Sequence, residues 1–340
     1  MADADDFPAI DECDGGDADA VQMAVAGDRP VLLRGIAATW PAVVEARKGD
    51  AAIARYLADR DCGKPVTVLV APPEVEGRYF YAPDMRGLNF RPEAMPMRAL
   101  LDRLLAAGGA PDAPSMYAGS TPTADSISGF ASENRLLVDT HGVDPRIWVG
   151  NASRIAPHYD MATNVAVVVA GRRRFTLFPP DQIANLYVGP VDRTVAGQPT
   201  SMVNLAHPDL DRFPRFAEAL AHARVADLSP GDAIYMPPMW WHHVRAEAPL
   251  NVLVNYWFGQ PADRFPFAAL MLAVHSIREL PDGERTAWRN WFDHYVFGAE
   301  AAGAVDHLPE HVRGVLGTPS AGRDAMILNY VIGMCGTDQR

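Results

Sequence analysis

Cysteine is scarce in this 340-residue chain, and the three that occur, Cys13, Cys62 and Cys335, stand far apart without a CxxC spacing. This scarcity argues against a disulfide framework and against a structural zinc knuckle. No apolar run approaches the about 20 residues that a membrane-spanning helix needs. We therefore expect a soluble protein in reducing surroundings, with no membrane partner.

Basic residues are also in the minority, since 30 Lys and Arg stand against 42 Asp and Glu and give a net charge of −12. Eight of the acids lie in the first twenty residues, and without them the net charge is −4. The arginine run 172–174 is too short to form the basic stripe that nucleic-acid backbones require. The acidic start, with no Lys or Arg before Arg29, does not fit a secretory signal. The sequence thus predicts a cytoplasmic protein with no nucleic-acid partner.

The chain contains 49% hydrophobic and 21% charged residues, enough for a large core. The residue pattern of the chain changes twice along the sequence. Residues 1–28 are rich in Asp and Ala, and we expect a solvated tail rather than a helical preface. Residues 29–259 form the main predicted domain, and residues 260–340 form a helical C-terminal region.

Between residues 116 and 258, short β-branched and aromatic runs are separated by Pro, Gly, Asn and Asp. Many short strands with turns between them predict an all-β sandwich or barrel rather than a parallel βαβ sheet. The segment before residue 116 mixes strand and helix patterns, which indicates an α/β decoration of that β-domain. The clearest strands are predicted at 163–170, 172–178, 233–236, 241–246 and 251–258.

After Pro261 the apolar residues recur at helical spacing, and two or three helices are expected to close the chain. These helices either pack on the β-domain or form a homodimer interface. The sequence alone favours neither of these two alternatives. The two apolar stripes consist of Phe267, Leu270, Met271, Val274 and Ile277, and of Trp288, Trp291, Phe292 and Tyr295.

His158 and Asp160 are two residues apart, and on a strand such residues point to the same face. They offer two corners of the two-His-one-carboxylate triad that holds Fe(II) with open coordination positions. The third ligand has to come from another strand. In an extended segment His242 shares a face with an apolar valine, so this face is expected to point inward and we favour His242. His243 is then a surface residue or one that supports a ligand. A bulge between Pro238 and His242 would reverse the assignment.

These segments resemble the JmjC-type cupins, and more closely the cupin-like branch that includes the asparaginyl hydroxylase acting on hypoxia-inducible factor. The resemblance spans about Pro30 to Phe258, two-thirds of the chain, and the ordered set of motifs is far more specific than any one of them. The matching pieces include Gly150-Asn151, Pro157-His158-Tyr159-Asp160, Leu177-Phe178-Pro179-Pro180-Asp181-Gln182, Pro230-Gly231-Asp232, Trp240-Trp241-His242-His243 and Asn255-Tyr256-Trp257.

The resemblance implies a mainly β, double-stranded β-helix of the cupin or jelly-roll type. It also implies Fe(II) as cofactor and 2-oxoglutarate and O2 as co-substrates, with hydroxylation of a C–H bond and release of succinate and CO2. By their matching positions, the implied iron ligands are His158, Asp160 and His242. The positions implied for the co-substrate pocket are Tyr117, Asn164, Arg173 and Asn255. Trp257 and Trp240 either form walls of the site that exclude water or belong to the core.

Arg173 stands where the nearest relatives carry a lysine for the distal carboxylate of 2-oxoglutarate. An arginine can bind a carboxylate bidentately, and strand parity places this one on an apolar face with Phe175 and Leu177. A buried guanidinium needs a partner, which is either the dicarboxylate or an internal acid, unless the side chain is displaced outward. A second departure is Ile155, where the asparaginyl hydroxylase has a threonine, so one hydrogen bond to the co-substrate is expected to be missing.

The leading hypothesis is therefore an Fe(II)- and 2-oxoglutarate-dependent oxygenase. Two alternatives stay open, namely a metal-binding cupin that acts on a small molecule without 2-oxoglutarate, and a non-catalytic binding module. The fold does not transfer a substrate. A protein or peptide side chain is favoured over a small metabolite, and histone demethylation is not expected because the motifs match hydroxylases better.

Overall fold

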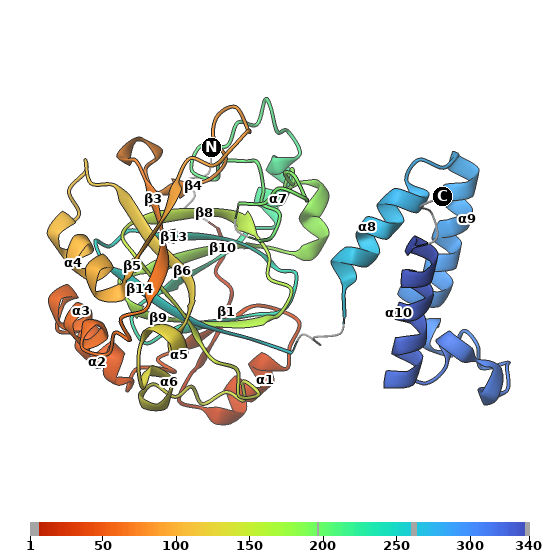
Figure 1. Cartoon of the computed structure of the whole chain (residues 1–340), viewed down its shortest axis with the longest axis horizontal. Coiled ribbons are helices and arrows are strands. Elements are labelled where there is room, and N and C mark those ends of the chain that lie inside the picture. The colour runs from red at the N-terminus through yellow and green to blue at the C-terminus, as the bar shows by residue number, and fades with distance from the viewer. Residues whose placement is uncertain (1–6, 196, 260–263, 337–340) are drawn as a thin grey trace. The chain divides into compact units, whose positions relative to one another are not determined.

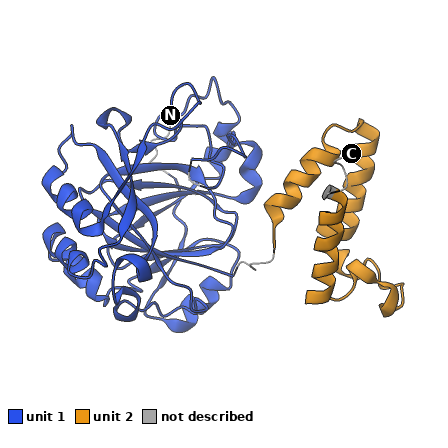
Figure 2. Ribbon diagram, in the orientation of Figure 1, with its two compact units in different colours: residues 1–261 blue, residues 262–340 orange. Residues whose placement is uncertain are grey.

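The computed structural model describes residues 7–195, 197–259 and 264–336. The chain separates into two compact units, residues 1–261 and 262–340 (Figure 2). Two β-sheets, both in the first unit, dominate the fold (Figure 1). None of the described helices combines the length and the hydropathy that a membrane crossing needs.

The larger sheet has nine strands and runs through the whole first unit. Its strands pair antiparallel, except for the parallel pair at one edge formed by β1 and β2. In spatial order the strands are β1 (Asp11–Asp14), β2 (Val31–Arg34), β12 (Ala233–Met236), β9 (Thr163–Ala170), β14 (Asn251–Phe258), β7 (Arg146–Gly150), β6 (Ser115–Pro122), β3 (Pro65–Ala71) and β5 (Arg91–Pro96).

The smaller sheet has five strands, of which only the short β4 pairs in parallel. In spatial order they are β11 (Arg224–Leu228), β10 (Arg173–Phe178), β13 (Trp241–Ala246), β8 (Ser153–His158) and β4 (Arg78–Tyr79). From β7 to β14 the chain passes repeatedly from one sheet to the other. This alternation is the topology of a jelly roll, so the predicted double-stranded β-helix is confirmed.

Strand β9 explains why the chain contains the uninterrupted apolar run 165–170. Val165, Val167 and Val169 pack on one face of the large sheet, and Ala166 and Val168 pack between the two sheets. Both faces of the strand are therefore buried, and no polar alternation is possible. The first face is covered by α2 (Pro41–Ala46), α3 (Asp50–Ala58) and α4 (Met97–Ala107). Other helices of this unit are α1 (Ala18–Val25), α5 (Thr123–Ser126), α6 (Phe130–Glu133), α7 (Phe216–Ala221) and the 3-10 turns Pro73–Val75 and Pro180–Ala184.

The acidic N-terminal segment belongs to the fold from residue 7 onward, so the expected solvated tail is wrong for this part of it. Strand β1 lies parallel to β2 at the edge of the large sheet, and Asp17 caps α1 by accepting from the backbone N–H groups of Asp19 and Ala20. Glu12 accepts a hydrogen bond from Arg34 at 2.9 Å. The partner of Glu12 lies 22 residues away, so local sequence patterns do not indicate this contact.

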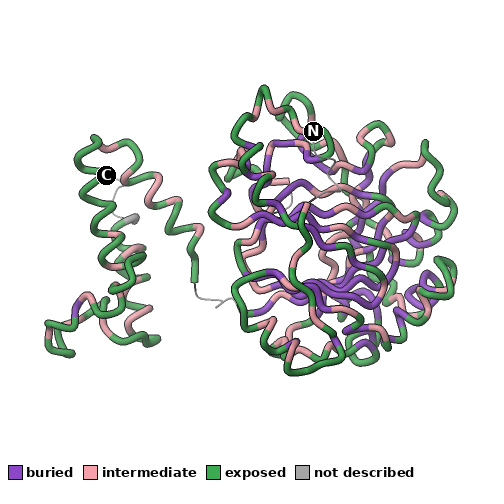
Figure 3. The backbone as a smooth tube through the Cα atoms, turned by 180° about the vertical axis from the view of Figure 1, so that it is seen from behind, coloured by how far each residue is buried: buried purple, intermediate pink, exposed green. Residues whose placement is uncertain are grey.

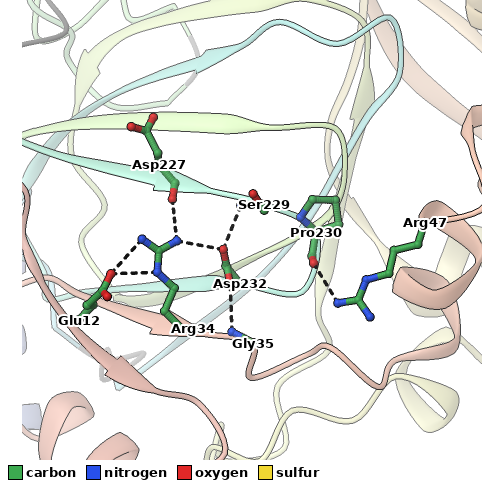
Figure 4. A network of polar contacts seen from close by, with 8 residues as sticks. All are labelled: Glu12, Arg34, Gly35, Arg47, Asp227, Ser229, Pro230 and Asp232. Carbon is green, nitrogen blue, oxygen red and sulfur yellow. Dashed lines mark hydrogen bonds and ion pairs between the residues drawn. The ribbon is translucent and has the colours of Figure 1, made fainter.

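Asp232, at the turn between β11 and β12, connects three segments (Figure 4). Its carboxylate accepts hydrogen bonds from the backbone N–H groups of Gly35 at 2.9 Å and Ser229 at 3.0 Å. Arg34 donates to the same carboxylate at 3.2 Å. The Pro-Gly-Asp motif therefore fixes the end of β2 against the turn that leads into β12.

The second unit is helical, as the apolar periodicity predicts. It contains α8 (Pro266–Ile277), α9 (Asp282–Phe292), a π-helical turn (Asp293–Phe297) and α10 (Ala321–Gly336), with 3-10 turns at Ala301–Gly303, Glu310–Val312 and Gly314–Leu316. Among its described residues, only Val305 is buried, as the prevailing green of Figure 3 shows. This unit therefore has almost no hydrophobic core of its own.

Candidate metal centre

Three side chains with metal-ligand atoms meet on the inner face of the small sheet. His158 ends β8, Asp160 follows two residues later, and His242 lies directly opposite His158 on β13. One ligand atom from each lies within 4.8 Å of the others, and the Nε2 atom of His242 is 3.7 Å from Oδ2 of Asp160. The structure thus brings together the triad that the sequence singled out.

Both histidines are held with the same ring nitrogen free. The Nδ1 atom of His158 lies 2.9 Å from the carbonyl oxygen of Ala156, and that of His242 lies 3.1 Å from the carbonyl oxygen of Trp240. A carbonyl can only accept, so Nδ1 carries the proton and the lone pair of Nε2 points into the site. In the neutral form of each ring, Nε2 is therefore the atom available to a metal ion.

Burial keeps His242 in this neutral form. Its pKa is lowered to about 4, mainly by the loss of solvation and also by the neighbouring His158. Asp160 acts in the opposite direction. Because a metal binds the unprotonated imidazole, the site does not have to displace a proton at neutral pH.

The register shift between β13 and β8 falls between His242 and Val244, after the candidate ligand. His242 therefore keeps the inner face, and His243 points to the outer one. The expectation that the outer face is wet is wrong, because His243 is only 8% exposed and Trp241 only 1%. Trp241 packs there with Phe216 of α7, a contact that strand parity cannot reveal.

A chain of hydrogen bonds orients the carboxylate of Asp160. The indole N–H of Trp148 donates to Oδ1 of Asn255 at 2.7 Å, and Nδ2 of Asn255 lies 3.4 Å from Oδ1 of Asn164. Asn164 donates in turn to Oδ2 of Asp160 at 2.7 Å. The chain starts at an obligatory donor and ends at an obligatory acceptor, so each amide orientation is determined. Both predicted asparagines line the cavity, and Trp148 is a residue that the sequence reasoning missed.

Arg173 is buried beside the triad without an acidic partner in the described chain. Gly171, with φ of 75°, turns the chain from β9 into β10, and Arg173 then shares the inner face with Phe175 and Leu177. The residue is 3% exposed, and its Nε atom has no hydrogen-bond partner. Burial lowers the pKa of the guanidinium, an effect that the nearby Tyr117 hydroxyl opposes. Of the two alternatives to a dicarboxylate, neither an internal acid nor outward displacement is observed here.

These residues line one cavity between the sheets, of about 970 Å³ including its open mouth. Besides Arg173, two buried polar atoms on its wall have no partner, namely Oγ1 of Thr200 and Nε1 of Trp257. Ile155 also lines the cavity, so Thr200 is a candidate for the hydrogen bond that Ile155 cannot make. Thr200 lies in an irregular segment, and no sequence pattern indicated it. Aromatic walls are formed by Tyr79, Phe90, Tyr117, Trp148 and Trp257.

Two imidazoles and one carboxylate converging at the end of a cavity are the donor set typical of Fe(II) sites with open coordination positions. The buried, unpartnered guanidinium a short way along the same cavity suits a carboxylate-bearing co-substrate. Both groups of residues therefore fit the iron and the 2-oxoglutarate that the resemblance implies.

Comparison with known proteins agrees with this geometry. Residues 18–264 of the 340 match the family described as cupin-like domain, which includes every residue of the triad and the cavity wall named above. The chain belongs to the cupin-like domain family. Within this family member, the match begins in α1 and covers every strand of both sheets except β1.

Curated relatives of this cupin-like protein share shorter segments. Human HSPB1-associated protein 1 is 32% identical over 156 residues, which cover 44% of this chain and 31% of the relative. Jumonji C domain-containing protein 5 of Drosophila melanogaster is 38% identical over 122 residues, covering 35% and 29%. Lysine-specific demethylase JMJ31 of Arabidopsis thaliana is 34% identical over 112 residues, covering 33% and 20%. The aligned part thus spans less than a third of each of these relatives.

Proposed function

We propose that this protein is an Fe(II)- and 2-oxoglutarate-dependent oxygenase whose catalytic domain is formed by residues 29–259. His158, Asp160 and His242 hold the iron. Iron bound in this way supplies the oxidation of a substrate C–H bond by O2, coupled to conversion of 2-oxoglutarate into succinate and CO2. Membership of the cupin-like family and the JmjC names among its relatives support this assignment.

The observation that carries the proposal is the buried Arg173 in the same cavity as the triad, which has no acidic partner among the described residues and whose Nε atom has no hydrogen-bond partner. An isolated buried guanidinium is costly, and it is expected only where a ligand supplies the opposite charge. We assign it to the distal carboxylate of 2-oxoglutarate, with the Tyr117 hydroxyl as a second donor. A metal-binding cupin that does not use a dicarboxylate has no need for this residue.

The other residues of the cavity position and shield the reactants. The chain from Trp148 through both asparagines fixes Oδ2 of Asp160, the oxygen that lies 3.7 Å from Nε2 of His242. The aromatic wall, in which Trp148 stacks on Tyr117 at 5.7 Å and meets Trp257 edge to face at 5.9 Å, limits access of water. Thr200 and the indole N–H of Trp257 offer further hydrogen bonds to bound co-substrate or substrate.

Anaerobic titration of the metal-free protein with Fe(II), with and without 2-oxoglutarate, tests the proposal. We expect a visible charge-transfer band that needs both components. His158→Ala should abolish the band, whereas Arg173→Gln should retain iron binding and require far more 2-oxoglutarate. Iron binding without a band would instead favour a cupin that acts on a small molecule without 2-oxoglutarate. Failure to bind iron at all would favour a non-catalytic binding module.

A protein or peptide side chain is our proposed primary substrate. Relatives bear the names HSPB1-associated protein 1 and lysine-specific demethylase, which both refer to protein targets. Incubation with a peptide library under turnover conditions should yield products heavier by one oxygen atom. Removal of an N-methyl group also begins with C–H hydroxylation, so formaldehyde should be measured in parallel. Release of formaldehyde would assign demethylation rather than stable hydroxylation to the enzyme. Formation of succinate only with small metabolites would contradict a protein substrate.

We further propose that residues 260–340 mediate homodimerisation. The described part of this region exposes large apolar side chains, among them Phe297 at 74%, Tyr330 at 69% and Ile332 at 67%, and buries almost none. A helical unit of this size without a core needs another surface to cover its apolar residues. Light scattering should give twice the chain mass of 36.9 kDa. Ile332→Asp should yield monomers, whereas Leu137→Asp, at an equally exposed site in the first unit, should not; a monomeric wild type would contradict the proposal.

A further inference from the structure

The outer face of the small sheet carries a row of four arginines, one on each of four adjacent strands. The strand registers place Arg174 opposite Arg245, Arg245 opposite Arg154, and Arg154 opposite Arg78. Like charges directly opposite one another on a sheet repel, so such a row is stable only when anions accompany it. The positions of the acidic side chains show which arginine of the row has no acidic partner.

Three of the four arginines have an acidic partner within the chain. Arg174 pairs with Asp227 at 2.6 Å, and Arg245 has Glu247 at 3.0 Å. Arg154 pairs with Glu76 at 2.9 Å. For the fourth, Arg78, the described residues supply no ion pair and no acceptor for the guanidinium, which stacks on the ring of Phe80 at 3.9 Å. The surplus positive charge of the row is therefore concentrated at Arg78, which is partly buried.

Arg78 and Arg154 border a small recess, of about 200 Å³ including its open mouth, that is lined by no acidic side chain. Its inner end is formed by His243, which is 8% exposed and whose Nδ1 atom has no partner. The recess continues outward into a groove of about 1510 Å³, which shares Arg78, Arg154 and Asn204 with it. The rim of that groove does carry acids, namely Glu74, Glu76 and Asp209.

We propose that this recess binds a compact, doubly charged oxyanion of the phosphate type. Two guanidinium groups and one buried imidazole nitrogen surround it, and arginine forks match phosphate oxygens bidentately. The exposed Glu76 is the group that a stronger anion displaces from Arg154. The acidic rim excludes extended polyanions, so the ligand is free phosphate or a single phosphorylated side chain of a peptide. The site lies on the opposite face of β8 and β13 from the metal triad and does not depend on the proposed oxygenase activity.

Calorimetric titration of the full-length protein with inorganic phosphate, and separately with a phosphoserine peptide and its unphosphorylated form, tests the site. We expect Arg78→Gln to weaken phosphate binding by about 10- to 100-fold. Arg212→Gln, which alters an exposed arginine of the outer groove only, should leave binding unchanged. Thermal melting shows whether each variant is folded. If Arg78→Gln does not fold, Arg78→Lys keeps the charge but loses the fork, and it should still bind phosphate more weakly than the wild type.

Two further variants separate this site from the inner cavity. His158→Ala and Arg173→Gln should both retain phosphate binding, which excludes binding to the metal centre and to the other unpartnered arginine. Arg78→Gln should conversely leave 2-oxoglutarate binding unchanged. Binding of the phosphopeptide alone, with the same response to Arg78→Gln, would support the site and identify a peptide as its source. Absence of binding for both probes, or binding indifferent to Arg78→Gln, would overturn the proposal.

Discussion

The two faces of the small sheet carry the same residue types, but the arginines on the two faces have opposite surroundings. On β13, His242 faces the cavity and His243 the outer side, and on β10, Arg173 and Arg174 are divided in the same way. Arg174 makes a short ion pair with Asp227 near solvent, whereas Arg173 is buried with no acid among the described residues. Residue type therefore does not identify a binding group. The combination of burial and a missing partner does, because that combination is costly unless a ligand completes it.

Replacing the adjacent histidines by phenylalanine, one at a time, should give the largest difference between the two faces. His242→Phe keeps a ring in the core but removes a ligand atom, and we expect loss of the band formed with Fe(II) and 2-oxoglutarate. His243→Phe changes the outer face and should leave that band intact. Visible spectroscopy under anaerobic conditions reads out both variants. Loss of the band in both, with native melting temperatures, would mean that the two faces are not independent.

The same histidines predict an acid-sensitive stability of the metal-free protein. Burial lowers the pKa of His242 to about 4 and that of His243 to about 3, below the usual histidine value of 6.5. The unfolded chain therefore binds protons first as the pH falls below about 6.5, and folding stability decreases until the folded pKa values are reached. For His242 alone this amounts to on the order of 3 kcal/mol.

Urea unfolding with a chelator present, compared at about pH 7 and about pH 5, measures this loss. His243→Phe should reduce the difference between the two conditions, because one of the two groups that resist protonation is then absent. A free energy of unfolding that does not fall between these conditions would show that the histidines are not buried as described.

Local patterns predicted the parts of the site that depend on strand parity. The inward side of Arg173 follows from the period of a strand, and the structure places it so. His158 and Asp160 also meet in one cluster, although β8 ends at His158 and Asp160 lies just beyond it. Parity failed for His243, because the segment 203–205 lies beside it on the outer face, and no periodicity in β13 encodes the position of that segment. The acidic strand β1 was missed for a similar reason, since Glu12 finds Arg34 only after β1 and β2 have paired.

The interactions between distant segments were beyond sequence reasoning. Trp148 and Asn255 are 107 residues apart and meet only because β7 and β14 are neighbours in a definite register. Thr200 reaches the cavity from a segment without regular structure. In each case the missing information is which strand or loop lies beside which, and that is a property of the folded sheet rather than of any one window.

The adjacent residues Arg173 and Arg174, on opposite faces of β10, give the next largest expected effect, which is on the binding of 2-oxoglutarate. Arg173→Gln should raise the dissociation constant for 2-oxoglutarate about 100-fold, because a charge-assisted bidentate contact is lost. Arg174→Gln removes only a surface ion pair and should change that constant by less than about 2-fold. Anaerobic titration at saturating Fe(II) provides both values. Equal effects of the two substitutions would refute the assignment of Arg173 to the co-substrate.

Arg173→Met sharpens this contrast by separating stability from binding. It replaces a buried charge without an acid partner by an apolar side chain of similar length, which is expected to be neutral or to stabilise the ligand-free protein by about 1–4 kcal/mol. The same variant should bind 2-oxoglutarate no better than Arg173→Gln. Urea unfolding without co-substrate measures the first effect, and a clear loss of stability would mean that Arg173 is held by a partner within the protein.

The smallest predicted effect concerns the chain of hydrogen bonds on the inner face, and two tryptophans provide a matched pair. Trp148→Phe preserves the ring stacked on Tyr117 but removes the donor that orients Asn255, so both amides and then Asp160 lose their fixed orientation. We expect Fe(II) affinity to fall about 10-fold, the lower end for groups that support a metal ligand. Trp257→Phe removes an indole N–H that has no partner in the described chain and should leave the affinity unchanged. Because both substitutions make the same change in volume within one cavity, a difference between them can only come from the hydrogen bond, and equal losses would assign the effect to packing instead.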